Sequence, residues 1–180
     1  MASMLTLRPP RLDDEALAVA LHRDEAVARY LWTYPRLNML AAREWFITAA
    51  GAEQGTYFPA ILEDGVTVGF GWFGNCDGVN AMLSIALVRH RGKGLGYEAA
   101  RLLLAYAFDD LKLHRVSTTV VEANVPARKL AERFGTLEGR MREAWEADPG
   151  VGASRQPVYI DVLVYGVLEA EWRALEAAHG

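Results

Sequence analysis

The residues best suited to chemistry lie in one short turn, residues 91–96, where Gly92, Gly94 and Gly96 alternate with Arg91, Lys93 and Leu95. Glycine has no side chain, so the backbone can turn sharply there and its N–H groups stay open to a ligand. The turn therefore presents bare donors beside basic side chains at the start of an expected helix. This is the chemistry of a phosphate or pyrophosphate site.

Two common phosphate-binding motifs do not fit this turn. A Walker-type loop requires Ser or Thr directly after its lysine, whereas Gly94 follows Lys93. The dinucleotide-binding fingerprint requires its third glycine at position 97, which is Tyr97. A glycine-rich strand-to-helix turn without a ligand remains the alternative at this point.

The turn joins an expected strand to an expected helix. Residues 84–88 form a nearly continuous apolar run, which is typical of a strand buried on both faces. From Leu95 onward apolar residues recur at helical spacing. The two elements together hold the glycines at a helix N-terminus.

The rest of the chain predicts strands that alternate with helices. Asp64 and Gly65 between two β-rich runs indicate a hairpin, and Pro59 in the first run indicates an edge strand or a bulge. The expected strands are residues 4–8, 56–62, 66–74, 84–88, 113–122, 137–145 and 158–165. Helices are expected to begin near Asp13, Asn38, Leu95 and Asn124, with helical residues at 23–32 and a short amphipathic helix at the end.

Residues 89–94, Arg-His-Arg-Gly-Lys-Gly, resemble the Q/R-x-x-G-x-G/A signature of the GNAT superfamily of acyltransferases. The resemblance implies that backbone amides of residues 91–96 hold the pyrophosphate of coenzyme A. The block from Asn124 to Gly135 is similar to the second half of the family's coenzyme site, which implies that Asn124 and Arg128 also bind the coenzyme. A helix cap for Asn124 and a solvated helix face for Arg128 are the alternative interpretations.

The likeness covers residues 56–172 in the family's order. Residues 136–144 and 161–172 are similar to the branch that acetylates N-terminal alanine or serine of ribosomal proteins. The resemblance implies one domain over residues 1–180, with a mixed α/β fold whose central sheet has about seven mostly antiparallel strands and helices on both faces. It also implies an acetyl-CoA-dependent N-acetyltransferase that works by direct attack in a ternary complex. A catalytically silent protein that binds coenzyme A as a sensor or structural subunit is the alternative.

Backbone groups supply much of the chemistry in this family. The resemblance implies that Ala86, Leu87 and Val88 bond the pantetheine arm, with an N–H near Leu87 or Val88 facing the thioester oxygen. The family's serine acid falls at Ala127 and its glutamate base falls at Trp145. We therefore expect water to pass the proton of the amine to Ser84, Glu143, Glu146 or a backbone carbonyl. Each of the three side chains also suits an ordinary strand position.

Without a strong general base, the acceptor should be an amine that is already largely neutral at cellular pH. An α-amine, with a pKa near 8, is substantially neutral at cellular pH, whereas a lysine side chain near 10.4 is almost wholly charged. We therefore expect a protein N-terminal α-amine or a small-molecule amine as acceptor. The aromatic residues that can line its site are Tyr30, Trp32, Tyr34, Trp72 and Trp145, although core packing explains them equally well.

Composition narrows the class of protein. The chain has 180 residues, 52% apolar and 23% charged, and a net charge of −4, which disfavours nucleic acid as a partner. No apolar run reaches membrane length, and the histidines show no metal-ligand spacing. The single cysteine, Cys76, suits a reducing cytoplasm. The last strand and helix are a possible homodimer surface.

Overall fold

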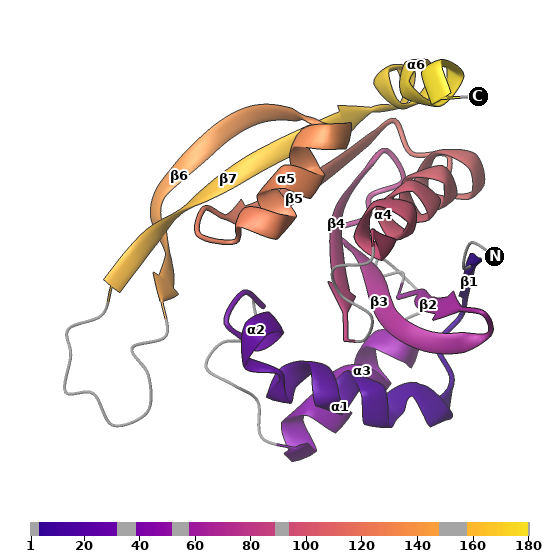
Figure 1. The fold of residues 1–180 in the computed structure, drawn as a ribbon, viewed down its shortest axis with the longest axis vertical. Helices are drawn as coiled ribbons and strands as arrows, with labels where there is room; N and C mark the ends of the chain where they lie inside the picture. Colours follow the sequence, from indigo (N-terminus) through magenta and orange to yellow (C-terminus); the bar gives the residue numbers. More distant parts are fainter. Residues whose placement is uncertain (1–3, 32–38, 52–57, 89–93, 148–157, 180) are drawn as a thin grey trace. The chain divides into compact units, whose positions relative to one another are not determined.

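The computed structural model describes residues 4–31, 39–51, 58–88, 94–147 and 158–179. The chain divides into two compact units, Met1–Val116 and Ser117–Gly180 (Figure 1). Each unit contains its own strands and helices.

Four antiparallel strands form the sheet of the first unit. They are β1 (Leu5–Arg8), β2 (Ala60–Glu63), β3 (Val66–Gly74) and β4 (Asn80–Leu87), in that order across the sheet. Asp64 and Gly65 have φ angles of 49° and 82° in the β2–β3 turn, which confirms the hairpin. The bulge expected near Pro59 occurs between Ile61 and Leu62, but an edge position for β2 is wrong because β1 pairs along its other side.

Helices cover both faces of this sheet. On one face lie α1 (Glu15–Arg23) and α3 (Met39–Gly51), which pack against each other (Figure 1). The short helices η1 (Leu12–Asp14) and α2 (Glu25–Ala28) flank α1. On the other face, α4 (Leu95–Ala105) continues into the π-helical turn η2 (Tyr106–Asp110). Gly71 gives α4 room, because a Cβ there would lie 2.6 Å from Leu103 of that helix.

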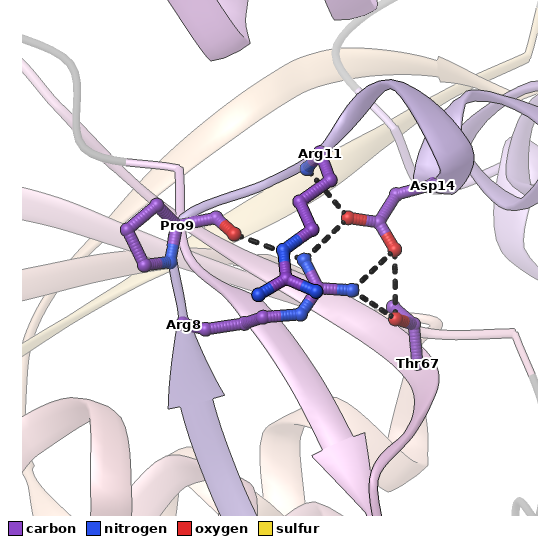
Figure 2. A network of polar contacts seen from close by, with 5 residues as sticks. All are labelled: Arg8, Pro9, Arg11, Asp14 and Thr67. Carbon is purple, nitrogen blue, oxygen red and sulfur yellow. Dashed lines mark hydrogen bonds and ion pairs between the residues drawn. The ribbon is translucent and has the colours of Figure 1, made fainter.

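A buried carboxylate fixes the start of α1 to the sheet (Figure 2). Asp14 is 4% exposed and accepts hydrogen bonds from both terminal nitrogens of Arg8, at 2.7 and 2.8 Å. It also accepts from the backbone N–H of Arg11 and the hydroxyl of Thr67, each at 2.7 Å. Burial alone would raise the pKa of Asp14, but these hydrogen bonds outweigh it and lower the pKa below its ordinary value.

The second unit contains all but the first two residues of β5 (Arg115–Val121), together with β6 (Thr136–Ala147) and β7 (Val158–Leu168), in the order β5-β7-β6. Helix α5 (Val125–Phe134) lies against them, with Ala127 and Ala131 packed on Val120, Leu163 and Tyr165. Helix α6 (Glu169–His179) follows β7 directly. Asn124 and Gly135 occupy the two caps of α5, as the sequence predicted.

These elements confirm the expected mixed α/β fold with seven mostly antiparallel strands. The single-domain assignment stays a prediction. Across the described residues, no helix combines the length and apolarity needed to cross a membrane. The same part of the chain contains no group of three His, Cys, Asp or Glu side chains placed to bind a metal ion.

Candidate functional site

The end of β4 alternates the direction of its backbone N–H groups relative to β3. The N–H of Val88 donates to Val68 O at 2.9 Å, so Val88 directs its N–H toward β3. Of the two positions expected to supply the N–H that faces the thioester oxygen, Val88 therefore has its N–H already paired, and Leu87 remains the candidate. Backbone groups of neighbouring strand residues point to opposite edges, so the N–H of Leu87 points away from β3. Ala86 again faces β3, since its carbonyl oxygen would lie 2.3 Å from a Cβ on Gly69. Of the three residues, Leu87 is the one that directs its N–H away from β3.

Gly94 occupies the N-cap of α4 with a φ of 79°. This left-handed conformation favours glycine, and the N-cap has no side chain to accept from the first N–H groups of the helix. Leu95 is buried and fixes the first turn, while Gly96 is half-buried. The remaining predicted phosphate-binding residues, Arg91, Gly92 and Lys93, lie outside the described residues.

Ser84 and Trp72 are cross-strand partners on β4 and β3. Their side chains point to the α1 and α3 face, because Phe70, two residues before Trp72, packs there with Phe46 of α3 at a ring-centroid distance of 6.0 Å. Val88 packs against the same cluster. Ser84 is half-buried on this face, so its hydroxyl adjoins an aromatic surface.

An aromatic wall covers this face next to Ser84. We define it as His22 of α1, Trp45 of α3, Phe58 before β2, and Trp72 of β3. The ring of Trp45 lies edge-to-face with each of the other three rings. The centroid distances are 4.9 Å to His22, 5.3 Å to Phe58 and 6.1 Å to Trp72. His22 is 4% exposed, and its burial lowers the pKa of its imidazole.

The wall contains only part of the predicted acceptor set, whose role stays a prediction. Trp72 belongs to it, and Tyr30 is half-buried after α2, whereas Trp32 and Tyr34 lie outside the described residues. Sequence reasoning missed Trp45 and His22 as site candidates. The signal was weak because both sit in helices whose aromatic and alanine residues indicate only packing.

In the second unit, Asn124 caps α5 with its side chain. Its Oδ1 accepts the backbone N–H of Ala127 at 3.3 Å. Arg128, one turn into the helix, lies with its Nε 3.6 Å from Oε1 of Glu132 and is 33% exposed. That same Oε1 accepts a hydrogen bond from the hydroxyl of Tyr165 at 3.4 Å. The helix alternative for Asn124 is confirmed, and Arg128 is a partly exposed cation in a weak ion pair.

A bulge in β6 positions the two candidate carboxylates. The regular pairing of β6 with β7 is interrupted between Met141 and Trp145. Glu143, which lies in this interruption, has a φ of 51°. Trp145 is 6% exposed, whereas Glu143 and Glu146 are exposed. Asp161 pairs with Arg140, its Oδ2 lying 3.0 Å from Nη1.

A sequence profile of the acetyltransferase (GNAT) domain matches residues 4–136. YdaF of Bacillus subtilis (strain 168), named provisionally as a ribosomal N-acetyltransferase, is 32% identical over 116 residues. That match covers 62% of this chain and only 59% of YdaF. YokL of the same organism, an uncharacterized SPbeta prophage-derived N-acetyltransferase, is 28% identical over 98% of this chain and 94% of its own.

Solved structures show the same fold. A spermidine N-acetyltransferase from Vibrio cholerae, crystallised with CoA and spermine, superimposes with a TM-score of 0.82 at 20% identity, covering 94% of this chain and 98% of that one. At this identity the likeness concerns the fold alone. A further acetyltransferase structure reaches a TM-score of 0.74 at 26% identity, covering 96% and 87% of the two chains.

Proposed function

Since the chain belongs to the GNAT acetyltransferase domain family, we propose that it transfers an acetyl group from acetyl-CoA to a primary amine. The favoured acceptor is the α-amine of a protein N-terminus or a small-molecule amine. The observation that carries the proposal is the pairing of Gly94 at the N-cap of α4 with the outward N–H of Leu87 at the end of β4. We further propose that the protein acts in the cytoplasm as a single domain, either as a monomer or as a homodimer.

The start of α4 fits a diphosphate. The first N–H groups of a helix have no partner within it, and the helix dipole adds a partial positive charge there. Gly94 has open space where a Cβ would stand, so a phosphate can approach its backbone. Arg91, Gly92 and Lys93 precede it in the sequence and would add two cations. In the second unit, Asn124 at the cap of α5 and the partly exposed Arg128 are our candidates for further coenzyme contacts.

Acetyl-CoA, when bound, supplies an acetyl group activated as a thioester. The N–H of Leu87 donates to the oxygen that becomes negative as the amine nitrogen attacks the carbonyl carbon. A C–N bond forms, the C–S bond breaks, and the proton lost by the amine ends on the departing thiolate. Because Leu87 acts through its backbone, the identity of its side chain matters little to this step.

Proton removal from the amine is assigned to Ser84, Glu143 or Glu146. Ser84 lies on the aromatic face of β4, and the two glutamates lie at or beside the β6 bulge with exposed side chains. Exposed carboxylates are weak bases, so they suit an acceptor that is largely neutral already, such as an α-amine. The provisional naming of YdaF as a ribosomal N-acetyltransferase supports the same choice.

Coenzyme binding is tested first, with calorimetry on the full chain. We expect coenzyme A and acetyl-CoA to bind, and ATP and NAD not to compete. Arg128→Ala should weaken coenzyme binding about fivefold to tenfold, the loss of one charge-assisted contact. Arg173→Ala is the matched control, because Arg173 forms a similar helical ion pair with Glu169, at 3.2 Å. Unchanged coenzyme affinity in Arg128→Ala would remove Arg128 from the site.

Transfer is then tested by thiol release with peptides that present either an α-amine or a lysine side chain. Faster reaction at the α-amine supports the proposal, and preference for lysine overturns the choice of acceptor. The alternative, a coenzyme-binding protein without activity, is favoured by one observation. Trp145, which stands where the family has its base, is buried and carries no proton-accepting group. Coenzyme binding without turnover on any amine would establish it.

A further inference from the structure

The aromatic wall of His22, Trp45, Phe58 and Trp72 combines buried and partly exposed rings. Phe58 and His22 are 4% exposed and the neighbouring Phe70 is 0% exposed, so these rings form the core. Trp45 and Trp72 pack on the same core but are only partly buried. Two large apolar rings thus reach the surface side by side, 6.1 Å apart at an interplanar angle of 82°.

The wall adjoins the backbone group proposed to stabilise the reacting oxygen. Trp72 pairs with Ser84 on β4, and Leu87 lies three residues farther along the same strand. At about 3.4 Å per residue, the two positions are roughly 10 Å apart. Val88, which packs on the same cluster, follows Leu87. An amine at Leu87 therefore has an apolar surface within reach of an extended substituent.

None of the four side chains that make up the wall is acidic. Its only ionisable member is His22, whose burial disfavours the charged imidazolium and lowers its pKa. Glu15 of α1 is paired with Arg43 of α3 at 2.6 Å. A polyamine would have to bring further charges against the rings of the wall, which carry no carboxylate to receive them.

We propose that Trp45 and Trp72 hold the apolar substituent of the acceptor, so that the protein selects amines with a single charge and an apolar or aromatic substituent over polyamines. This inference rests on the proposed acetyltransferase function and gives it a substrate class. Indole rings suit the task because they are large, rigid and apolar, and they also attract a cation that approaches the ring face.

The test compares three acceptors by steady-state kinetics with acetyl-CoA. Two are short peptides that differ only in their first residue, phenylalanine or aspartate, and the third is spermidine. We expect kcat/KM for the phenylalanine peptide to exceed both others about tenfold or more, from partial burial of its side chain. Equal or faster reaction of spermidine overturns the proposal.

Variants of the wall identify the residues responsible. Trp72→Leu and Trp45→Leu should each lower kcat/KM for the phenylalanine peptide about tenfold, mainly through KM, and should lower it much less for the aspartate peptide. Trp72→Phe retains an aromatic ring and should fall between wild type and Trp72→Leu. Phe73→Leu is the control, since Phe73 is buried in the same strand but on the opposite face, next to Tyr106. An equal loss for all acceptors in the tryptophan variants would contradict a role in selection.

A binding readout separates this inference from the proposed function. Tryptophan fluorescence of the full chain is followed as the phenylalanine peptide is added, with and without coenzyme A. Quenching that disappears in Trp72→Leu supports the docking surface even if no acetyl group is transferred, in which case the proposed function alone fails. Absence of quenching together with equal kinetics for the three acceptors overturns the inference while leaving the transferase activity in place.

Discussion

Asp161 of β7 accepts the backbone N–H of Glu143 in β6, with its Oδ1 2.9 Å from the nitrogen. Its other oxygen, Oδ2, lies 3.0 Å from Nη1 of Arg140, and Nη2 of Arg140 donates to Glu122 at 2.6 Å. The backbone N–H of Glu122 in turn donates to Asp161 O at 2.9 Å. One carboxylate therefore ties the β6 bulge to the segment that leads into α5, where Asn124 lies two residues farther on.

We expect Asp161→Ala to release the bulge. Glu143 holds a φ of 51°, which a side-chain-bearing residue rarely adopts without a fixed partner. Under the role proposed for Glu143, its displacement should lower kcat roughly tenfold, because catalytic groups depend on exact placement. Asp161→Asn retains an oxygen for the Glu143 N–H and should keep most of the activity.

Glu122→Gln is the control for this prediction, because it weakens only the far end of the Arg140 bridge. A stopped assay of acetyl transfer with saturating acetyl-CoA measures kcat, and circular dichroism checks that each variant is folded. Identical kcat values for Asp161→Ala and wild type would show that the bulge does not serve the reaction.

A second prediction concerns the acid stability of the first unit. Removing the Asp14 carboxylate leaves the half-buried Arg8 guanidinium without its main partner, so Asp14→Ala should lower the free energy of unfolding by about 2–3 kcal/mol. The folded-state pKa of Asp14 is lowered, so its contribution is present above the ordinary value of 3.8 and is lost as the pH falls through the folded-state pKa.

Urea unfolding across pH 2 to 7 measures this contribution. Wild type should lose stability at the acid end more steeply than Asp14→Asn, which has no carboxyl group to protonate at that site. Glu25→Gln is a control, because it removes an exposed carboxylate of α2 in the same unit. Parallel pH curves for wild type and Asp14→Asn would contradict the prediction.

The sequence predicted the elements whose signals are local. The β2–β3 turn follows from Asp64 and Gly65, which tolerate positive φ, and the start of α5 follows from Asn124, whose own side chain caps it. Features that depend on distant residues were not predicted. The β6 bulge depends on Asp161, 18 residues beyond Glu143, and β2 is an inner strand because residues 5–8 pair with it.

In the candidate site, too, the sequence predicted the features with local signals and not those that depend on distant residues. Gly94 was predicted as part of the anion-binding turn because glycines mark such a turn in any sequence, and the structure places it at the N-cap of α4. The unavailability of the Val88 N–H depends on strand register, which the sequence of one strand does not contain. Trp45 was not predicted as a site residue. It lies beside His22 and Trp72 because α1 packs against α3, and a contact between two helices cannot be read from the sequence of either one.

A third prediction follows from the burial of His22. Its pKa is lowered in the folded protein, so the unfolded chain binds a proton more readily than the folded chain below the ordinary value of 6.5. The free energy of unfolding should therefore fall as the pH drops below 6.5, until the folded-state pKa is passed. His22→Phe preserves an aromatic ring against Trp45 and should remove this part of the pH dependence.

Thermal unfolding at pH 5 and pH 7 tests the effect of His22. The melting temperature of wild type should be lower at pH 5, and the difference should shrink in His22→Phe. His114→Gln is the control, since it removes another histidine outside the aromatic wall. If the difference in melting temperature between pH 5 and pH 7 were unchanged in His22→Phe but lost in His114→Gln, the pH dependence would come from His114. That outcome would contradict the prediction.

The last prediction separates backbone strain from coenzyme binding with two matched glycines. Gly94 at the start of α4 and Gly78 in the β3–β4 turn have φ angles of 79° and 83°, and a Cβ on either would meet nothing within 4 Å. Alanine at either position therefore costs about 1–2 kcal/mol of stability, because its Cβ disfavours the left-handed conformation.

Only Gly94 borders the proposed diphosphate site, where a methyl group would stand between the phosphate and the first N–H groups of α4. Calorimetry should accordingly show coenzyme A binding about tenfold or more weaker in Gly94→Ala and unchanged in Gly78→Ala, at similar losses in melting temperature. Equal coenzyme affinity in the two variants would mean that the phosphates bind elsewhere than at the start of α4.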